Sequence, residues 1–226
     1  MNLAVFASTK GTDLQAVIDA IKGGQLEHVD LRFVLSNKPD AYALMRARDA
    51  GIEAIFLDPA GKTREEYDRE CLQLCQARKI NLILLIGYMR IISPVLIEPF
   101  RHRIMNIHPS LLPRYPGMDL DVHRAVLAAG EKSTGCTLHF VDEGTDTGPI
   151  LIQRTLTINQ GETPDTLKGR VQKLEQEVIL DGLKQMRDQI TRRPRPMISG
   201  SRKNKKKTID FVCFSFLDSH FHGNDK

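Results

Sequence analysis

The sequence lacks any apolar run that approaches the ~20 consecutive residues needed to cross a bilayer. Hydrophobic residues make up 41% of the chain and charged residues 27%, as in ordinary globular domains. The first residues, MNLAVFA, also lack the basic stretch that opens a signal peptide. We therefore expect a soluble protein of the cytoplasm rather than a membrane protein.

Cysteine is scarce, with four in 226 residues. Only Cys71 and Cys75 are close in sequence, and they lie four residues apart within a helical pattern. A cysteine zinc site usually has a tight Cys-x-x-Cys pair and a second pair of ligands, and the sequence contains neither. We expect reduced thiols that serve packing, and no metal.

Most of the chain lacks an excess of positive charge. Residues 191–226 carry nine Lys or Arg and three Asp or Glu, so the formal charge of +4 divides into +6 for this end and −2 for residues 1–190. The basic end follows neither helical nor strand periodicity and repels itself. We predict one folded domain over residues 1–190 and a basic, disordered tail over 191–226, so the charge does not indicate nucleic-acid binding.

Short apolar runs alternate with amphipathic stretches throughout residues 1–190, without an internal repeat. This order implies right-handed crossovers and parallel strands. Residues 82–86 (LILLI) are continuously apolar, as in a central strand covered on both faces. The sequence thus predicts a single-domain α/β fold with an open, mostly parallel twisted sheet flanked by helices on both faces. The predicted strands are 3–7, 31–35, 54–57, 82–86, 103–107, 136–141 and 150–156, and the predicted helices are 14–21, 41–50, 64–77, 94–99, 120–129 and 164–190.

Two segments carry residues suited to acid–base chemistry. Asn106 and His108 alternate at the end of a predicted strand, so both side chains point to the same side, where open α/β sheets bind ligands. Asp146 lies in a Gly-rich, acidic loop between two later strands. Acyl transfer needs an acid–base pair and a donor aimed at a developing oxyanion, which these types supply. Considered alone, His108 is better explained as a histidine whose hydrogen bonds are satisfied within a turn, and Asp146 as a residue that favours turns. Considered together, the two residues favour an active site.

Four motifs resemble those of the folate-dependent formyltransferases, in particular the enzymes that formylate glycinamide ribonucleotide. They are residues 36–38, 87–94, 106–117 and 142–149, and the resemblance runs from residue 1 to about 190. It implies a Rossmann-like formyltransferase catalytic domain over residues 1–190 that uses 10-formyltetrahydrofolate as formyl donor. Asn106 and protonated His108 would stabilise the tetrahedral oxyanion, and Asp146 would keep His108 charged, since an anionic neighbour favours the imidazolium.

The resemblance also implies a folate pocket. From composition alone, residues 89–92 are better read as plain core, and Arg64 as a helix surface charge beside Asp68. Their positions in the family pattern imply instead that these residues bind folate. Arg64 would lie near the folate tail, whose carboxylates suit a guanidinium. The implied folate-binding residues are Arg64, Met89, Arg90, Ile91, Ile92, Val141, Asp142, Glu143, Gly144 and Thr145.

The implied acceptor site lies where the first strand leads into a helix, because a helix N-terminus offers free amides to a phosphate. It comprises Gly11, Thr12 and Asp13, together with Glu175 on the last helix. The family pattern here is Ser-Gly-x-Gly-Ser-Asn, and this chain has Thr9 in place of the first Gly and Asp13 in place of Asn. The Asp13 change matters because a carboxylate repels a nearby phosphate. Without the resemblance, Thr12 or Asp13 is a helix cap and Glu175 lies on a solvated helix face.

The resemblance therefore predicts formyl transfer to glycinamide ribonucleotide in purine biosynthesis, by a monomer or homodimer with small-molecule substrates and no membrane or nucleic-acid partner. Asp13 leaves open another formyl-folate enzyme: a formyltetrahydrofolate hydrolase, or a methionyl-tRNA or sugar-nucleotide formyltransferase. A non-catalytic, RNA-associated role through residues 202–207 is a further alternative, but that run has no interleaved aromatic residues for base stacking.

Overall fold

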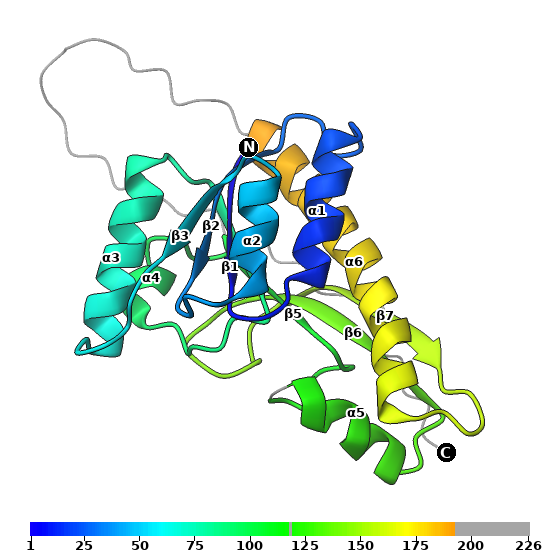
Figure 1. Cartoon of the computed structure of the whole chain (residues 1–226). Coiled ribbons are helices and arrows are strands. Elements are labelled where there is room, and N and C mark those ends of the chain that lie inside the picture. Colours follow the sequence, from blue (N-terminus) through cyan, green and yellow to red (C-terminus); the bar gives the residue numbers. More distant parts are fainter. Residues whose placement is uncertain (118, 193–226) are drawn as a thin grey trace, which may run out of the picture. The chain divides into compact units, whose positions relative to one another are not determined.

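The computed structural model describes residues 1–117 and 119–192, so the predicted tail from residue 193 onward lies outside the described residues. The described chain alternates strands and helices (Figure 1). The strands are β1 (Asn2–Ala7), β2 (Asp30–Ser36), β3 (Glu53–Phe56), β4 (Leu82–Ile86), β5 (Ile104–His108), β6 (Ser133–Phe140) and β7 (Ile150–Thr157), and the helices are α1 (Thr12–Lys22), α2 (Tyr42–Asp49), α3 (Arg64–Ala77), α4 (Pro94–Ile97), α5 (Asp119–Ala128) and α6 (Pro164–Arg192).

The strands form one seven-stranded sheet in the order β3-β2-β1-β4-β5-β6-β7. The five strands from β3 to β5 are parallel, and β6 and β7 are antiparallel to their neighbours. The predicted mostly parallel α/β sheet is confirmed. Its two antiparallel strands form a hairpin, which needs no crossover helix.

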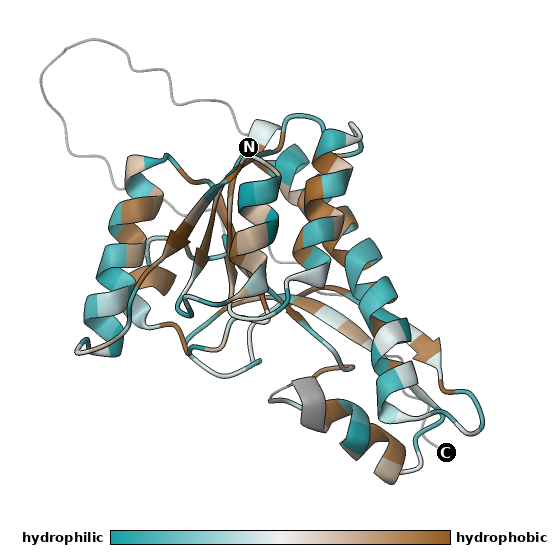
Figure 2. Cartoon of the chain, viewed as in Figure 1, coloured by the Kyte–Doolittle hydropathy of each residue, from teal (hydrophilic) through white to brown (hydrophobic). Residues whose placement is uncertain are grey.

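Strand alternation divides the core between the two faces of the sheet. In β1, Leu3 and Val5 pack with residues of α1, α2, α5 and α6. Ala4 and Phe6 point the other way and pack with α3 and α4. Figure 1 shows α1, α2 and α6 together on one side and α3 and α4 on the other, and Figure 2 shows striped helices, whose apolar stripes match these buried residues. A sheet with both faces buried requires the continuously apolar β4.

Capping residues set the ends of two helices. Thr63 and Glu66 form a reciprocal capping box at the start of α3. The Thr163 hydroxyl accepts a hydrogen bond from the Thr166 amide at 3.3 Å, just before Pro164 opens α6. Helix α6 continues to Arg192, two residues beyond the predicted end of the domain.

The strand order reverses direction between β1 and β4, because the chain moves outward to β2 and β3 and then returns to the other side of β1. Ligands of open α/β sheets bind at such a switch point, beyond the carboxyl ends of the strands. The loops that leave β1, β4 and β5 all emerge at this edge.

Candidate active site

Ser8 ties together three of the segments that the sequence motifs singled out. Its hydroxyl donates to the Asn37 side-chain oxygen at 2.5 Å and accepts from the Met89 amide at 2.9 Å. The loops after β1, β2 and β4 therefore meet at one point. Gly87 allows this approach: it has φ +54, and a Cβ there would lie 2.7 Å from the Thr9 hydroxyl.

His108 ends β5 and is 3% exposed. Its Nε2 lies 2.8 Å from the backbone oxygen of Tyr115, and its Nδ1 lies 3.5 Å from Oδ2 of Asp146. A carbonyl only accepts hydrogen bonds, so Nε2 carries a hydrogen and Nδ1 is the nitrogen that faces the carboxylate. A bare Nδ1 would turn its lone pair towards an anion, so this arrangement favours the imidazolium.

Asp146 lies on the loop between β6 and β7, in the left-handed region with φ +57, which Asp tolerates better than most residues. Its Oδ2 accepts the Gly117 amide at 3.1 Å. Burial alone would raise the pKa of Asp146, but the hydrogen bond to His139, the neighbouring His108 and the Gly117 amide together lower the pKa below its ordinary value. Asp146 is therefore ionised beside His108.

Asn106 and His139 face each other across β5 and β6, so the sheet brings Asn106 and His108 together with Asp146. Nε2 of the buried His139 lies 3.6 Å from Oδ1 of Asp146 and 3.1 Å from the Asn106 amide nitrogen. The sequence reasoning missed His139. The signal was a histidine in the mostly apolar strand 136–141, but its place opposite Asn106 depends on the antiparallel register, which the residues around it do not reveal.

A cavity of about 340 Å³ opens next to these residues. Its walls include eight of the predicted folate-binding residues and all three predicted catalytic residues. Met89 and Ile91 keep 37% and 61% of their surface exposed, which is unusual for large apolar side chains and suits contact with an aromatic ligand. The lining residues from the prediction are Met89, Arg90, Ile91, Ile92, Val141, Asp142, Gly144, Thr145, Asn106, His108 and Asp146.

Two predicted folate-binding residues do not line this cavity. The Glu143 carboxylate pairs instead with Arg101 at 2.7 Å, on the exposed side of its loop. Arg64, at the start of α3, pairs with Glu65 at 3.2 Å and is half exposed. The cavity is thus lined by the loop after β4, by the end of β5 with the loop that follows it, and by the end of β6 with part of the loop after it.

The loop after β4 is held from beneath by α3. The buried Asp68 carboxylate accepts the Ser93 amide at 2.5 Å, and the Arg90 guanidinium lies 4.2 Å from the centre of the Tyr67 ring. Burial is the main influence on Asp68 and raises its pKa, against the lowering effects of the Ser93 hydrogen bonds and Arg90. Asp68 thus connects a helix to the wall of the cavity, a contact that sequence reasoning did not anticipate.

None of the predicted acceptor residues lines this cavity. Gly11 caps α1 with φ +63, and Thr12 begins the helix. Asp13 is buried and accepts the Gln176 side chain at 3.3 Å, which joins α1 to α6. Burial raises the pKa of the Cys136 thiol, and the charges of Glu175 and Asp13 raise it further, so the two carboxylates gather near the same sulfur.

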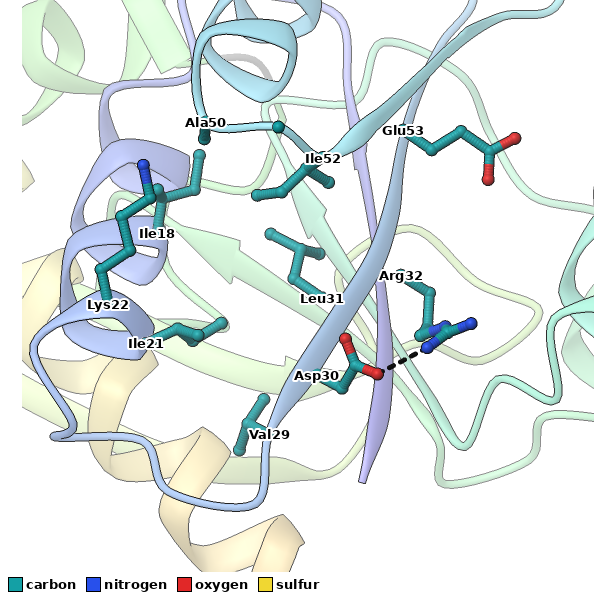
Figure 3. A pocket seen from close by; sticks show the side chains of 11 residues that line it. Ile18, Ile21, Lys22, Val29, Asp30, Leu31, Arg32, Ala50, Ile52 and Glu53 are labelled. Atoms are coloured by element: carbon teal, nitrogen blue, oxygen red, sulfur yellow. Dashed lines mark hydrogen bonds and ion pairs between the residues drawn. The ribbon is translucent and has the colours of Figure 1, made fainter.

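A larger hollow of about 480 Å³ lies at the opposite edge of the sheet, near the start of β2 and β3 (Figure 3). Its charged side chains include Asp30 and Arg32, which pair with each other at 2.7 Å, and Glu53, which pairs with Arg78. The other lining side chains are mostly aliphatic. The lining of the hollow includes no histidine and no side-chain amide beside its carboxylates, whereas the smaller cavity has both, so chemistry rather than size identifies the site.

Two further findings concern the part of the chain that the structure describes. Over residues 1–117 and 119–192, no cluster of three or more His, Cys, Asp or Glu side chains is arranged to bind a metal ion. In the same residues, no helix combines the length and apolar character needed to span a membrane.

Known proteins resemble this chain in both sequence and structure. The Formyl transferase family model matches residues 1–183. The phosphoribosylglycinamide formyltransferase of Escherichia coli is 40% identical over 176 residues, covering 77% of this chain and 82% of its own length. The trifunctional purine biosynthetic protein adenosine-3 of Drosophila melanogaster is 44% identical over 175 residues, which are 76% of this chain but only 13% of that longer protein.

A solved structure agrees with this assignment. Glycinamide ribonucleotide transformylase 1 from Symbiobacterium toebii superposes with a TM-score of 0.80 at 36% identity, covering 84% of this chain and 88% of that one. The family match covers most of the chain and includes β1 to β7 and the convergence of the catalytic segments. The chain therefore belongs to the Formyl transferase family.

Proposed function

We propose that this protein transfers the formyl group of 10-formyltetrahydrofolate to the amine of glycinamide ribonucleotide, a step of purine biosynthesis. The names of its relatives support this reaction. The observation that carries it is the convergence of Asn106, His108 and Asp146 at the cavity beside the loops after β4 and β6. One amide, one imidazole and one carboxylate at a single point meet the needs of acyl transfer.

The reaction begins when the amine nitrogen attacks the formyl carbon. A carbon–nitrogen bond forms, and the electron pair of the carbonyl moves to its oxygen. The Asn106 amide donates a hydrogen bond to this oxyanion, and the positive charge of His108 lowers its energy. In other enzymes one such preorganised donor is worth about 3–4 kcal/mol of barrier.

The intermediate collapses when the bond between the formyl carbon and the folate nitrogen breaks. The attacking amine must lose a proton and the leaving nitrogen must gain one. Asp146 is ionised and faces the same point, so it accepts the first proton, directly or through water, and returns it to the leaving nitrogen. Its charge also keeps His108 protonated.

The pterin of the donor occupies the cavity of about 340 Å³, against the apolar side chains of Met89 and Ile92 and the loop at Val141–Thr145. Residues 89–92 lie outside helices and strands, so their backbone groups other than the Met89 amide, which donates to Ser8, can pair with a flat heterocycle. Arg64 would reach only an extended folate tail. Gly11 and Thr12 with Glu175 hold the ribonucleotide, whose phosphate meets the amides at the start of α1. Asp13 belongs to the same site, where its carboxylate opposes the phosphate charge.

A direct assay separates this reaction from the alternatives. Tetrahydrofolate release is followed with 10-formyltetrahydrofolate alone and after glycinamide ribonucleotide is added. We expect turnover only when the acceptor is present, with one formylated product for each tetrahydrofolate. Equal turnover in its absence would instead identify a formyltetrahydrofolate hydrolase, and turnover only with methionyl-tRNA or a sugar nucleotide would identify the other acceptors.

The same proposal extends to the organisation of the chain. Residues 1–190 form the catalytic domain, and the basic segment that follows is accessory. We place the protein in the cytoplasm as a monomer or homodimer that works on small molecules, because formyl transfer between two soluble metabolites requires neither a membrane nor a nucleic acid.

A further inference from the structure

We propose that Glu131, which lies outside the cavity, is a positioning residue for His108 and acts through Tyr115. The inference rests on the proposed formyl transfer, in which His108 is the cation beside the oxyanion. It assigns a role to a residue that none of the sequence motifs includes.

Glu131 holds the end of the loop that follows β5. It lies two residues before β6 begins at Ser133, and its side chain is 19% exposed. Its Oε1 accepts the Tyr115 hydroxyl at 2.8 Å and also contacts the Arg114 guanidinium. One carboxylate therefore binds two successive side chains of the loop, which is a stronger restraint than either contact alone.

Tyr115 needs such a restraint because its backbone is in the left-handed region, with φ +54. This conformation is costly for a residue with a bulky side chain, so surrounding contacts must maintain it. It turns the Tyr115 carbonyl back towards β5, where the oxygen lies 2.8 Å from Nε2 of His108 and 3.1 Å from the Ser110 hydroxyl. The bond from Tyr115 to Glu131 and the bond from Tyr115 to His108 thus lie at opposite ends of one residue.

The same short segment binds both members of the catalytic pair. Tyr115 accepts from His108 with its carbonyl, and Gly117 donates to Asp146 with its amide at 3.1 Å. Because Nε2 is committed to a carbonyl, Nδ1 is left to face Asp146 at 3.5 Å. If Tyr115 moves, the His108 ring loses its hydrogen bond to the Tyr115 carbonyl. That hydrogen bond determines which ring nitrogen of His108 faces the Asp146 carboxylate.

We call the connection from Glu131 through Tyr115 to His108 the relay. Few charged groups of the described residues contact it. Asp146 faces His108 from the loop after β6, and His139 on β6 faces the same carboxylate. Arg114 is the charged partner of Glu131. A neutral residue at position 131 therefore leaves the charges in contact with His108 unchanged, and any effect on His108 must travel through the loop.

Two variants test the relay. Tyr115→Phe keeps the ring and the carbonyl but removes the hydroxyl that binds Glu131, and Glu131→Gln removes the charge. We expect kcat for formyl transfer to fall about tenfold in each, as for loss of a hydrogen bond to a charged group, with KM for both substrates within about twofold of wild type. Glu131→Asp should recover part of kcat. Glu53→Gln breaks a comparable ion pair with Arg78 far from the site and serves as the control.

Nitrogen-15 NMR of labelled histidine provides a readout that a purely structural role would not alter. In the wild type, both ring nitrogens of His108 should give signals of protonated nitrogen, and in Tyr115→Phe and Glu131→Gln these signals should shift towards a mixture of tautomers. Wild-type kcat in both variants overturns the proposal, and so does a lowered kcat with unchanged His108 signals. If the wild-type protein does not transfer formyl groups, the proposed function fails, and the His108 signals alone then decide whether the relay exists.

Discussion

The side-chain nitrogen of Asn106 lies 3.1 Å from Nε2 of His139, directly across β5 and β6. Nδ1 of His139 lies 2.9 Å from the Phe140 carbonyl, which only accepts, so Nδ1 carries a hydrogen. Nε2 of His139 lies between the Asn106 amide nitrogen and Oδ1 of Asp146, 3.6 Å from the latter. The contact with His139 fixes the orientation of the Asn106 amide, whose nitrogen can then donate a hydrogen to the oxyanion.

This relationship predicts that His139 acts through Asn106. We expect His139→Ala to lower kcat about tenfold, because the amide loses its orientation, and Asn106→Ala to lower it by about 100-fold or more, because the donor is lost. Steady-state rates of the double variant should match those of Asn106→Ala alone, since coupled residues are not additive. Multiplied losses would show instead that the two side chains act independently.

His108 and Asp146 should each be needed for chemistry rather than binding. His108→Ala removes the cation, and Asp146→Asn removes the group that accepts the amine proton. We expect each change to lower kcat by at least ~100-fold at saturating substrate. Calorimetric titration with tetrahydrofolate should show nearly unchanged binding, and near-normal turnover in either variant would eliminate the proposed mechanism.

The lowered pKa of Asp146 has a consequence for stability. A carboxyl whose pKa is lower in the folded state contributes stability above its unfolded pKa of about 3.9 and loses it as the pH falls through the folded value. Urea unfolding should therefore show a gap between wild type and Asp146→Asn that shrinks as the pH falls below about 4. A gap that does not shrink as the pH falls from about 4 to about 2 would contradict this assignment.

Asp68 should show the opposite dependence on pH. Burial raises its pKa, so its contribution is fully favourable below the unfolded value of about 3.9 and is lost as the pH rises through the folded value. Asp68→Asn keeps an oxygen that can accept the Ser93 amide. We expect this variant to gain free energy of unfolding relative to wild type between about pH 4 and 7, by about 1.4 kcal/mol for each unit of raised pKa. Parallel stability curves would refute the prediction.

Asp13 should weaken binding of the phosphorylated acceptor. Its carboxylate lies at the first turn of α1, where the phosphate is expected, and like charges repel. We expect Asp13→Asn to lower KM for glycinamide ribonucleotide about fivefold at low salt, with kcat unchanged and a smaller effect at high salt. Asp19→Asn, on the exposed face of the same helix, is the matched control. An unchanged or higher KM would mean that Asp13 does not face the phosphate.

The basic segment after α6 should be dispensable for catalysis. A chain that ends at Arg192 retains every described strand and helix of the domain. We expect its kcat and KM to lie within about twofold of the full chain and its melting temperature to be unchanged, because the described core and cavity are formed by residues up to 192. Loss of formyl transfer would move the domain boundary into the segment.

Local sequence patterns were sufficient to predict the strands, the helices and the mostly parallel sheet. Periods of 2 and 3.6 residues belong to the chain itself, and the alternation of Asn106 and His108 follows from the first of them. Element ends were less certain, as α6 shows by its extension to Arg192, because helix ends depend on small capping energies.

The partners of the catalytic residues came only from tertiary contacts. His139 reaches Asn106 through the register of β5 and β6, and Glu131 reaches His108 through Tyr115. Glu143, adjacent to cavity residues in sequence, turns outward to Arg101. Periodicity shows which face of an element a residue occupies, whereas the group that lies opposite it depends on how distant segments pack, and that information is not contained in any local stretch of the chain.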